Sequence, residues 1–109
     1  MKQFEVWWAE MPPPLGRRPV LVLTRTPALR YLTRCIVAEV TATVRDIPQE
    51  VELGPDEGLS RRCVANLDNV HVVPIGALDS RAGVLADARH VEVKRALGHA
   101  LGWSELLEL

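Results

Sequence analysis

The hydrophobic positions of this chain fall in short runs that are separated by turn-forming residues. The run at residues 20–23 is apolar at every position, which predicts a strand buried on both faces, because a half-buried strand would alternate. Residues 50–53 do alternate, as is typical of a strand with one face in water. In chain order the pattern predicts six strands, at residues 4–10, 18–24, 33–43, 50–53, 63–66 and 70–73.

The spacing of hydrophobic residues changes after Pro74. Across residues 87–101 it becomes helical, and Gly102 provides a natural end to the helix. The predicted apolar face of this helix consists of Val93, Ala96, Leu97, Ala100 and Leu101. Three prolines predict a loop at residues 11–16, and residues 26–30 favour a turn or a single helical turn. Six short strands followed by one helix predict an α+β fold, a small SH3-like curved β-sheet or barrel with a C-terminal helix.

A chain of 109 residues, 48% of them hydrophobic, predicts one folded domain that spans residues 1–109. Its core would be modest in size, so dimerisation would help to stabilise it. Cys35 and Cys63 lie in apolar runs and are predicted to be buried, reduced thiols. The chain contains no long apolar segment, so we expect no signal peptide, no membrane span and a cytoplasmic protein.

The net charge of −1 argues against binding of nucleic acid through bulk electrostatics, but the charges are unevenly distributed. Residues 17–45 carry six arginines and a single acid, Glu39, whereas residues 46–59 carry five acids and no base. Such an asymmetry allows a basic face on a nearly neutral protein. An ordinary solvated surface accounts for the same charges, and both readings stay open at this point.

The usual catalytic motifs are missing from the sequence. His71 is predicted to lie half-buried in a strand and His90 and His99 in solvent on the helix, and none has a metal-ligand spacing. There is no phosphate-binding glycine loop, no nucleophilic serine motif and no carboxylate pair in an apolar setting. An enzyme built from this chain would therefore work without a metal, a cofactor or a conventional acid–base pair.

Arg18 and Thr41 are the candidates for chemistry, because each stands at one end of an apolar strand. Arg18 precedes Pro19, which favours an extended backbone, and its guanidinium can hold two phosphate oxygens at once. The hydroxyl of Thr41 can donate to a phosphate oxygen and hold it in line. A surface arginine at a strand end and a threonine chosen for its β-propensity are the alternatives.

Several segments of the chain, in order, resemble the MazF/PemK family of toxin endoribonucleases. They are WWAE at residues 7–10, GRRPVLVL at 16–23, IVAEVT at 36–41, VEL at 51–53, EGL at 57–59, VANLDNV at 64–70 and RAL at 95–97. The likeness covers nearly the whole chain, and the Arg-Pro-Val-Leu-Val segment is its most specific part. It implies a homodimer of SH3-like barrels and a small cognate antitoxin as partner.

The resemblance also implies a reaction and a site. Members of this family cleave single-stranded RNA without a metal: the ribose 2′-OH attacks the adjacent phosphate, leaving a 2′,3′-cyclic phosphate and a 5′-OH. The family's catalytic arginine and threonine match Arg18 and Thr41. We expect Arg18 to stabilise the developing charge and Thr41 to orient the phosphate. Single-stranded RNA binds by stacking and phosphate contacts, for which Arg17, Arg25 and Pro13 are candidates, together with Arg45.

Two further functions are compatible with the same sequence. A non-catalytic inhibitor of DNA gyrase that resembles CcdB would share the fold, since a fold does not fix a function. A binding module for RNA or for the antitoxin, without catalysis, is the other. Cleavage of RNA separates the endoribonuclease from both.

Overall fold

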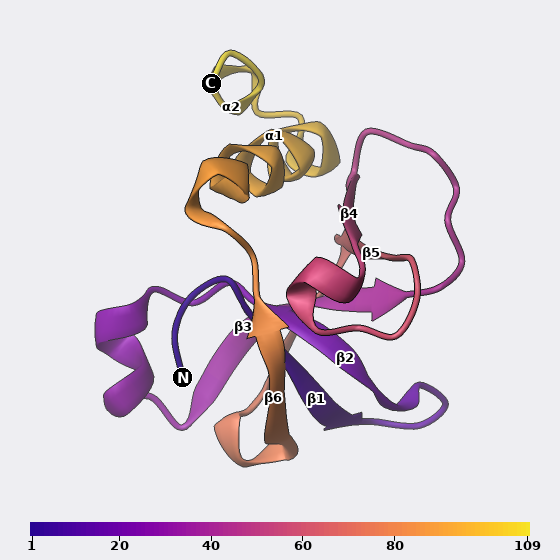
Figure 1. The fold of residues 1–109 in the computed structure, drawn as a ribbon. Helices are drawn as coiled ribbons and strands as arrows, with labels where there is room; N and C mark the ends of the chain where they lie inside the picture. The colour runs from indigo at the N-terminus through magenta and orange to yellow at the C-terminus, as the bar shows by residue number, and fades with distance from the viewer.

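The computed structural model describes residues 1–109, and its core is a single antiparallel sheet of six strands in the order β4-β5-β3-β2-β1-β6 (Figure 1). The strands are β1 (Glu5–Met11), β2 (Gly16–Val22), β3 (Arg34–Thr41), β4 (Glu50–Leu53), β5 (Cys63–Pro74) and β6 (Leu78–Val84). The helices α1 (His90–Leu101) and α2 (Ser104–Leu107) follow, and α1 contacts β4 and β5. This arrangement is the curled sheet with a C-terminal helix that the sequence predicts.

The central strands are buried on both faces of the sheet, as their continuous apolar runs predict. In β2, Leu21 belongs to one hydrophobic cluster and its neighbours Val20 and Val22 belong to another. All three side chains are fully buried. Burial of a valine or leucine side chain stabilises the fold by about 1.5–3 kcal/mol. The α1 helix covers only the cluster that contains Leu21, because Val93 and Ala96 pack there.

The strand pattern after residue 60 differs from the sequence prediction. Residues 63–66 and 70–73, predicted as two strands, belong to one long strand, β5. The segment 67–69 between them lies in a bulge: Ala38 pairs with Val70, whereas the next residue of β3, Glu39, pairs with Asn66. A bulge places extra residues in one strand without ending it, and for this reason polar residues there look like a loop in the sequence.

The edge strand β6 was missed entirely by the sequence prediction. Its residues 79–81 are polar and exposed, so the strand lacks an apolar alternation. It exists because it pairs with β1 along the sheet edge, from Glu5 opposite Val84 to Ala9 opposite Leu78. Backbone hydrogen bonds to a partner strand leave no signature in the side-chain pattern.

The C-terminal helix is confirmed, with changes at its ends. Residues 87–89 form a 3₁₀ turn before α1 begins at His90, and Gly102 ends the helix with φ 70°. Leu101, predicted on the apolar face, is 50% exposed, because the chain turns into α2 at that point. His90 is not solvated as predicted: its ring stacks on Phe4 with centroids 3.8 Å apart, whereas His99 is exposed.

Both cysteines are buried free thiols, as predicted, and burial raises the pKa of Cys35. No helix of the structure combines the length and the apolar character that crossing a bilayer requires.

Glu5 at the start of β1 predicts how stability depends on pH. Burial raises the pKa of its carboxyl, but hydrogen bonds from Trp7, the Lys2 amide and Arg81 outweigh burial and hold that pKa below its ordinary value of 4.5. A depressed folded-state pKa contributes stability above the unfolded-state value, and this contribution is lost as the pH falls through the folded-state value. We expect Glu5→Gln to lower the free energy of unfolding at neutral pH and progressively less below pH 4.5, as measured by urea denaturation. An equal loss at all pH values would contradict this role.

Candidate active site

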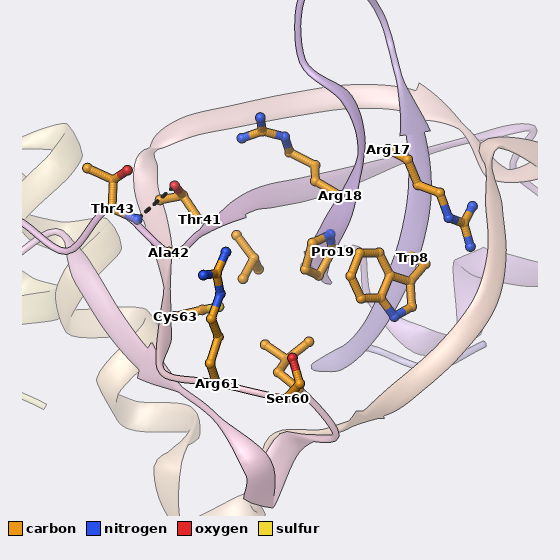
Figure 2. A pocket seen from close by; sticks show the side chains of 12 residues that line it. Trp8, Arg17, Arg18, Pro19, Thr41, Ala42, Thr43, Ser60, Arg61 and Cys63 are labelled. Carbon is orange, nitrogen blue, oxygen red and sulfur yellow. Dashed lines mark hydrogen bonds between the residues drawn. The ribbon is translucent and has the colours of Figure 1, made fainter.

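A cavity of about 600 Å³ opens where β2 begins and β3 ends, and both candidate catalytic residues line it (Figure 2). Its walls come from Trp8 of β1, residues 17–19 of β2, residues 40–43 at and just after the end of β3, residues 59–61 of the loop before β5, and Cys63 at the start of β5. Three of these residues are arginines and none is acidic. A cavity lined by one sign of charge concentrates ligands of the opposite sign, so this cavity suits an anion.

The strand register brings Arg18 and Thr41 together. The ladder between β2 and β3 runs from Val22 opposite Val37 to Val20 opposite Glu39 and goes no further. Extending this register by two residues places Arg18 across from Thr41. Figure 2 shows Arg18 extending toward the side of the cavity where Thr41 ends β3. Two residues far apart in the sequence therefore reach one opening from neighbouring strands.

Arg18 is held by two partners. Its Nη1 donates to Glu39 Oε1 at 2.5 Å, and its Nε and Nη2 donate to the carbonyl oxygen of Leu15 at 3.3 and 3.2 Å. Its side chain is 26% exposed, so the guanidinium is fixed and still accessible. These are the properties expected of a group that stabilises a developing negative charge.

Thr41 has a hydroxyl that is oriented by the backbone after β3. Its Oγ1 accepts a hydrogen bond from the Thr43 amide at 3.1 Å. The hydroxyl proton remains available, because a hydroxyl donates one hydrogen bond while it accepts others. Thr41 can therefore donate to an anion in the cavity.

The remaining polar groups of the cavity come from both sides of it. The Arg17 guanidinium lies 5.7 Å from the centre of the Trp8 ring, within the range of a cation–π contact. A hydrogen bond and ion pair with Asp79 raise the pKa of Arg17 and lower that of Asp79. Arg61 is exposed and extends into the opening in Figure 2 beside Ser60.

The candidate RNA-binding residues do not all gather here. Arg17 lines the cavity, whereas Pro13, Arg25 and Arg45 do not. Pro13 is exposed in the turn between β1 and β2, Arg25 lies beside a different depression near Tyr31, and Arg45 is exposed in the loop after β3. These candidates lie close together along the sequence, but they belong to different connections between strands, and the folded sheet places them apart in space.

Glu39, Ser60 and Arg61 are not among the site residues that the sequence predicted. Glu39 carried a usable signal: it is a lone charge inside an apolar strand, and buried charges require partners. Ser60 and Arg61 carried none, since an arginine in a polar loop is ordinary. His71, half-buried as predicted, contacts Glu39 rather than the cavity, and no group of three His, Cys, Asp or Glu side chains is placed to hold a metal ion.

A curled antiparallel sheet with a cationic cavity at the ends of its central strands defines a small β-protein suited to bind an anionic chain. The sequence matches the family described as PemK-like, MazF-like toxins of type II toxin-antitoxin systems over residues 2–101. The protein belongs to this family.

Individual relatives agree with this assignment. The chain is 44% identical over 101 residues to the "Probable endoribonuclease MazF5" of Mycobacterium tuberculosis, covering 92% of each chain. It is 35% identical over 88 residues to the "Endoribonuclease MazF3" of the same species, covering 79% of this chain and 85% of the relative. Among solved structures, "Mycobacterium tuberculosis toxin MazF-mt6" superimposes with a TM-score of 0.85 at 31% identity, covering 90% of this chain and 96% of that one.

Proposed function

We propose that this toxin-family protein is an endoribonuclease that cleaves single-stranded RNA at specific sequences, with Arg18 and Thr41 as its catalytic residues. One observation carries the proposal: both side chains line the same cavity, which holds three arginines and no carboxylate. The relatives named as endoribonucleases, at 35–44% identity, support the class of activity. Cytoplasmic RNA would be its substrate.

The proposed reaction is an internal transfer at one phosphate. The 2′ oxygen of the ribose bonds to phosphorus as the bond from phosphorus to the 5′ oxygen of the next nucleotide breaks. The 2′-OH loses its proton and the leaving 5′ oxygen gains one, so the products are a 2′,3′-cyclic phosphate and a 5′-OH. Arg18 stabilises the negative charge that builds on the phosphate oxygens. Thr41 donates to a non-bridging oxygen and holds the phosphate in line.

Two partners follow from family membership. A toxin of a type II toxin–antitoxin system is paired with an antitoxin, so we propose a small cognate antitoxin for this chain. The exposed apolar side chains Ile36, Val70 and Val72 on neighbouring strands β3 and β5 leave apolar area for a second copy of the chain, and we propose a homodimer.

The proposed function is tested with single-stranded RNA of mixed sequence and purified protein in EDTA. We expect cleavage at a short recurring sequence, with a 5′-OH on one fragment and a cyclic phosphate on the other. An RNA that carries a 2′-deoxynucleotide immediately 5′ of the scissile phosphate is expected to stay intact, because the nucleophile is missing. Tight RNA binding without cleavage of any sequence would overturn the proposal.

Replacement of Thr41 tests the role of its hydroxyl. We expect Thr41→Val to lower kcat for RNA cleavage about a hundredfold, because one donor to the developing charge is lost. Thr33→Val is the matched control: Thr33 is an exposed threonine outside the cavity, so we expect a change below about threefold. Equal losses in the two variants would contradict a specific role for the Thr41 hydroxyl.

A further inference from the structure

Glu39 is a buried carboxylate that the proposed reaction does not use directly. It lies in β3, two residues before the strand ends, between the buried residues Ala38 and Val40, and only 11% of its side chain is exposed. It does not line the cavity. A charge inside an apolar strand lowers the stability of the fold unless it is paired, so the partners of Glu39 indicate its role.

The two carboxylate oxygens of Glu39 bind side chains from two different strands. Oε1 accepts from Arg18 Nη1 at 2.5 Å, and Oε2 lies 3.1 Å from His71 Nε2. A carboxylate only accepts, so this contact is a hydrogen bond in the His71 tautomer that has its N–H at Nε2. Glu39 thus bridges β2 and β5, with one fixed group on each side.

The bulge in β5 makes this bridge possible. The register between β3 and β5 shifts between Ala38 and Glu39, so the segment 67–69 is extra relative to β3. His71 is the second residue after this segment and pairs with Val37, two residues from Glu39 on the same strand face. Bulges commonly re-aim side chains next to functional sites, and this one brings His71 within reach of Glu39.

The contacts of Arg18 leave it able to bind a phosphate. Three of its five N–H groups have partners: Nε and one on Nη2 donate to the Leu15 carbonyl, and one on Nη1 donates to Glu39. One N–H remains on each terminal nitrogen. Such a pair is the fork that guanidinium groups use to hold two oxygens of one phosphate.

We propose that Glu39, fixed in turn by His71, is a positioning residue that holds the Arg18 guanidinium in its phosphate-binding orientation; this inference rests on the proposed endoribonuclease function. An arginine side chain is long and adopts many rotamers, so a free guanidinium loses much of its freedom when it binds. Glu39 and the Leu15 carbonyl restrict that freedom before RNA arrives. Glu39 acts through Arg18 and not on the substrate.

The kinetic test compares Glu39→Ala with Glu92→Ala. Glu92 also pairs with an arginine, since its Oε2 accepts from Arg89 Nε at 2.8 Å, but it lies on α1 away from the cavity. We expect Glu39→Ala to lower kcat about thirtyfold to a hundredfold with little change in KM, because a misplaced catalytic group costs turnover. We expect wild-type rates for Glu92→Ala. A wild-type kcat in Glu39→Ala would overturn the proposal.

Chemical rescue separates positioning from a general effect on the fold. With Arg18→Ala, free guanidinium ion is expected to enter the vacated space and restore part of the activity, because Glu39 and the Leu15 carbonyl still offer their acceptors. With Arg18→Ala combined with Glu39→Ala, we expect no rescue. Equal rescue of both proteins would show that Glu39 does not hold the guanidinium.

A measurement that needs no RNA keeps this inference distinct from the proposed function. The Nη1–H signal of Arg18, the group that donates to Glu39, is expected in ¹⁵N nuclear magnetic resonance to exchange slowly with water in the wild type and rapidly in Glu39→Gln, whose neutral amide holds a guanidinium less strongly. His71→Ala is expected to speed exchange by a smaller factor. If the wild-type protein cleaves no RNA, the proposed function fails, whereas unchanged exchange in Glu39→Gln removes the positioning role.

Discussion

Arg18→Ala is expected to lower the rate constant of RNA cleavage about a thousandfold while the protein stays folded. The substitution removes a guanidinium that lines the cavity, at the position reached when the register of β2 and β3 is extended to Thr41. Loss of one preorganised donor to a developing charge typically costs a hundredfold to a thousandfold in turnover, and Arg18 offers two such donors as well as a full charge. The measurement is single-turnover cleavage of an RNA that contains the recognised sequence.

Two control variants make this result specific. Arg18→Lys keeps the charge but loses the fork of donors, so we expect it to recover only a small part of the activity. Arg30→Ala removes an exposed arginine that lies outside the cavity, and we expect it to cleave like the wild type. If Arg18→Ala cut RNA at the wild-type rate, the assignment of the active site would be wrong.

Gly83→Ala is expected to destabilise the protein by about 3 kcal/mol or more, which for a chain of this size lowers Tm by roughly 15 °C. A Cβ atom at Gly83 would lie 2.3 Å from the carbonyl oxygen of Glu57, far inside contact distance. The same two backbone segments are equally close at Gly58: a Cβ atom there would lie 1.9 Å from the carbonyl oxygen of Ala82, the neighbour of Gly83. Backbone atoms on both sides leave no flexible side chain that can move away.

The contact between Gly58 and Gly83 also supports the site. Gly58 has φ +86°, which favours glycine, and it leads directly into residues 59–61 of the cavity wall. We therefore expect Gly83→Ala to weaken RNA binding as well as stability. Gly76→Ala is the matched control, because a Cβ there would have no atom within 4 Å, and we expect its melting temperature to change by about 2 °C at most. Similar melting temperatures for the Gly83→Ala and Gly76→Ala proteins would contradict the close packing.

The pairing of Arg18 with Glu39 divides the cavity arginines into those that form an ion pair and one that does not. Arg18 is already paired with a carboxylate, so its contribution to attracting RNA from a distance is partly compensated. Arg61, which forms no ion pair, is then the cavity arginine best suited to attract RNA. A paired and fixed arginine stabilises charge at one point, whereas an unpaired arginine attracts the RNA anion electrostatically.

Much of the fold could be predicted from the sequence, because burial of one face or of both faces of a strand produces a recognisable pattern of apolar and polar residues. The fully apolar run of β2 predicted burial on both faces, and the alternation of β4 predicted buried Val51 and Leu53 beside exposed Glu52. Two elements were not predictable in this way. The bulge of β5 has the composition of a loop, and β6 has exposed polar residues because it is an edge strand.

The part of the site that lies at strand ends could be predicted from the sequence. Arg18 and Thr41 were selected from their positions next to apolar runs, and the structure places both at one cavity. Arg25 and Arg45 were selected as guanidinium groups able to contact RNA, and the structure places both outside that cavity. Nearness in sequence predicts nearness in space only within one element, and these residues lie in the connections between elements.

The sequence by itself determined which segments form the core, where the terminal helix stops and which two residues stand at the strand ends. Only the tertiary structure decided that β6 closes the sheet edge against β1, that Glu39 joins Arg18 to His71, and that Ser60 and Arg61 complete the cavity. The physical reason is the same in each case. Burial selects an apolar side chain at each buried position, so it can be predicted from the sequence. Strand register is set by backbone hydrogen bonds, which nearly every residue can form, so the side chains do not reveal it.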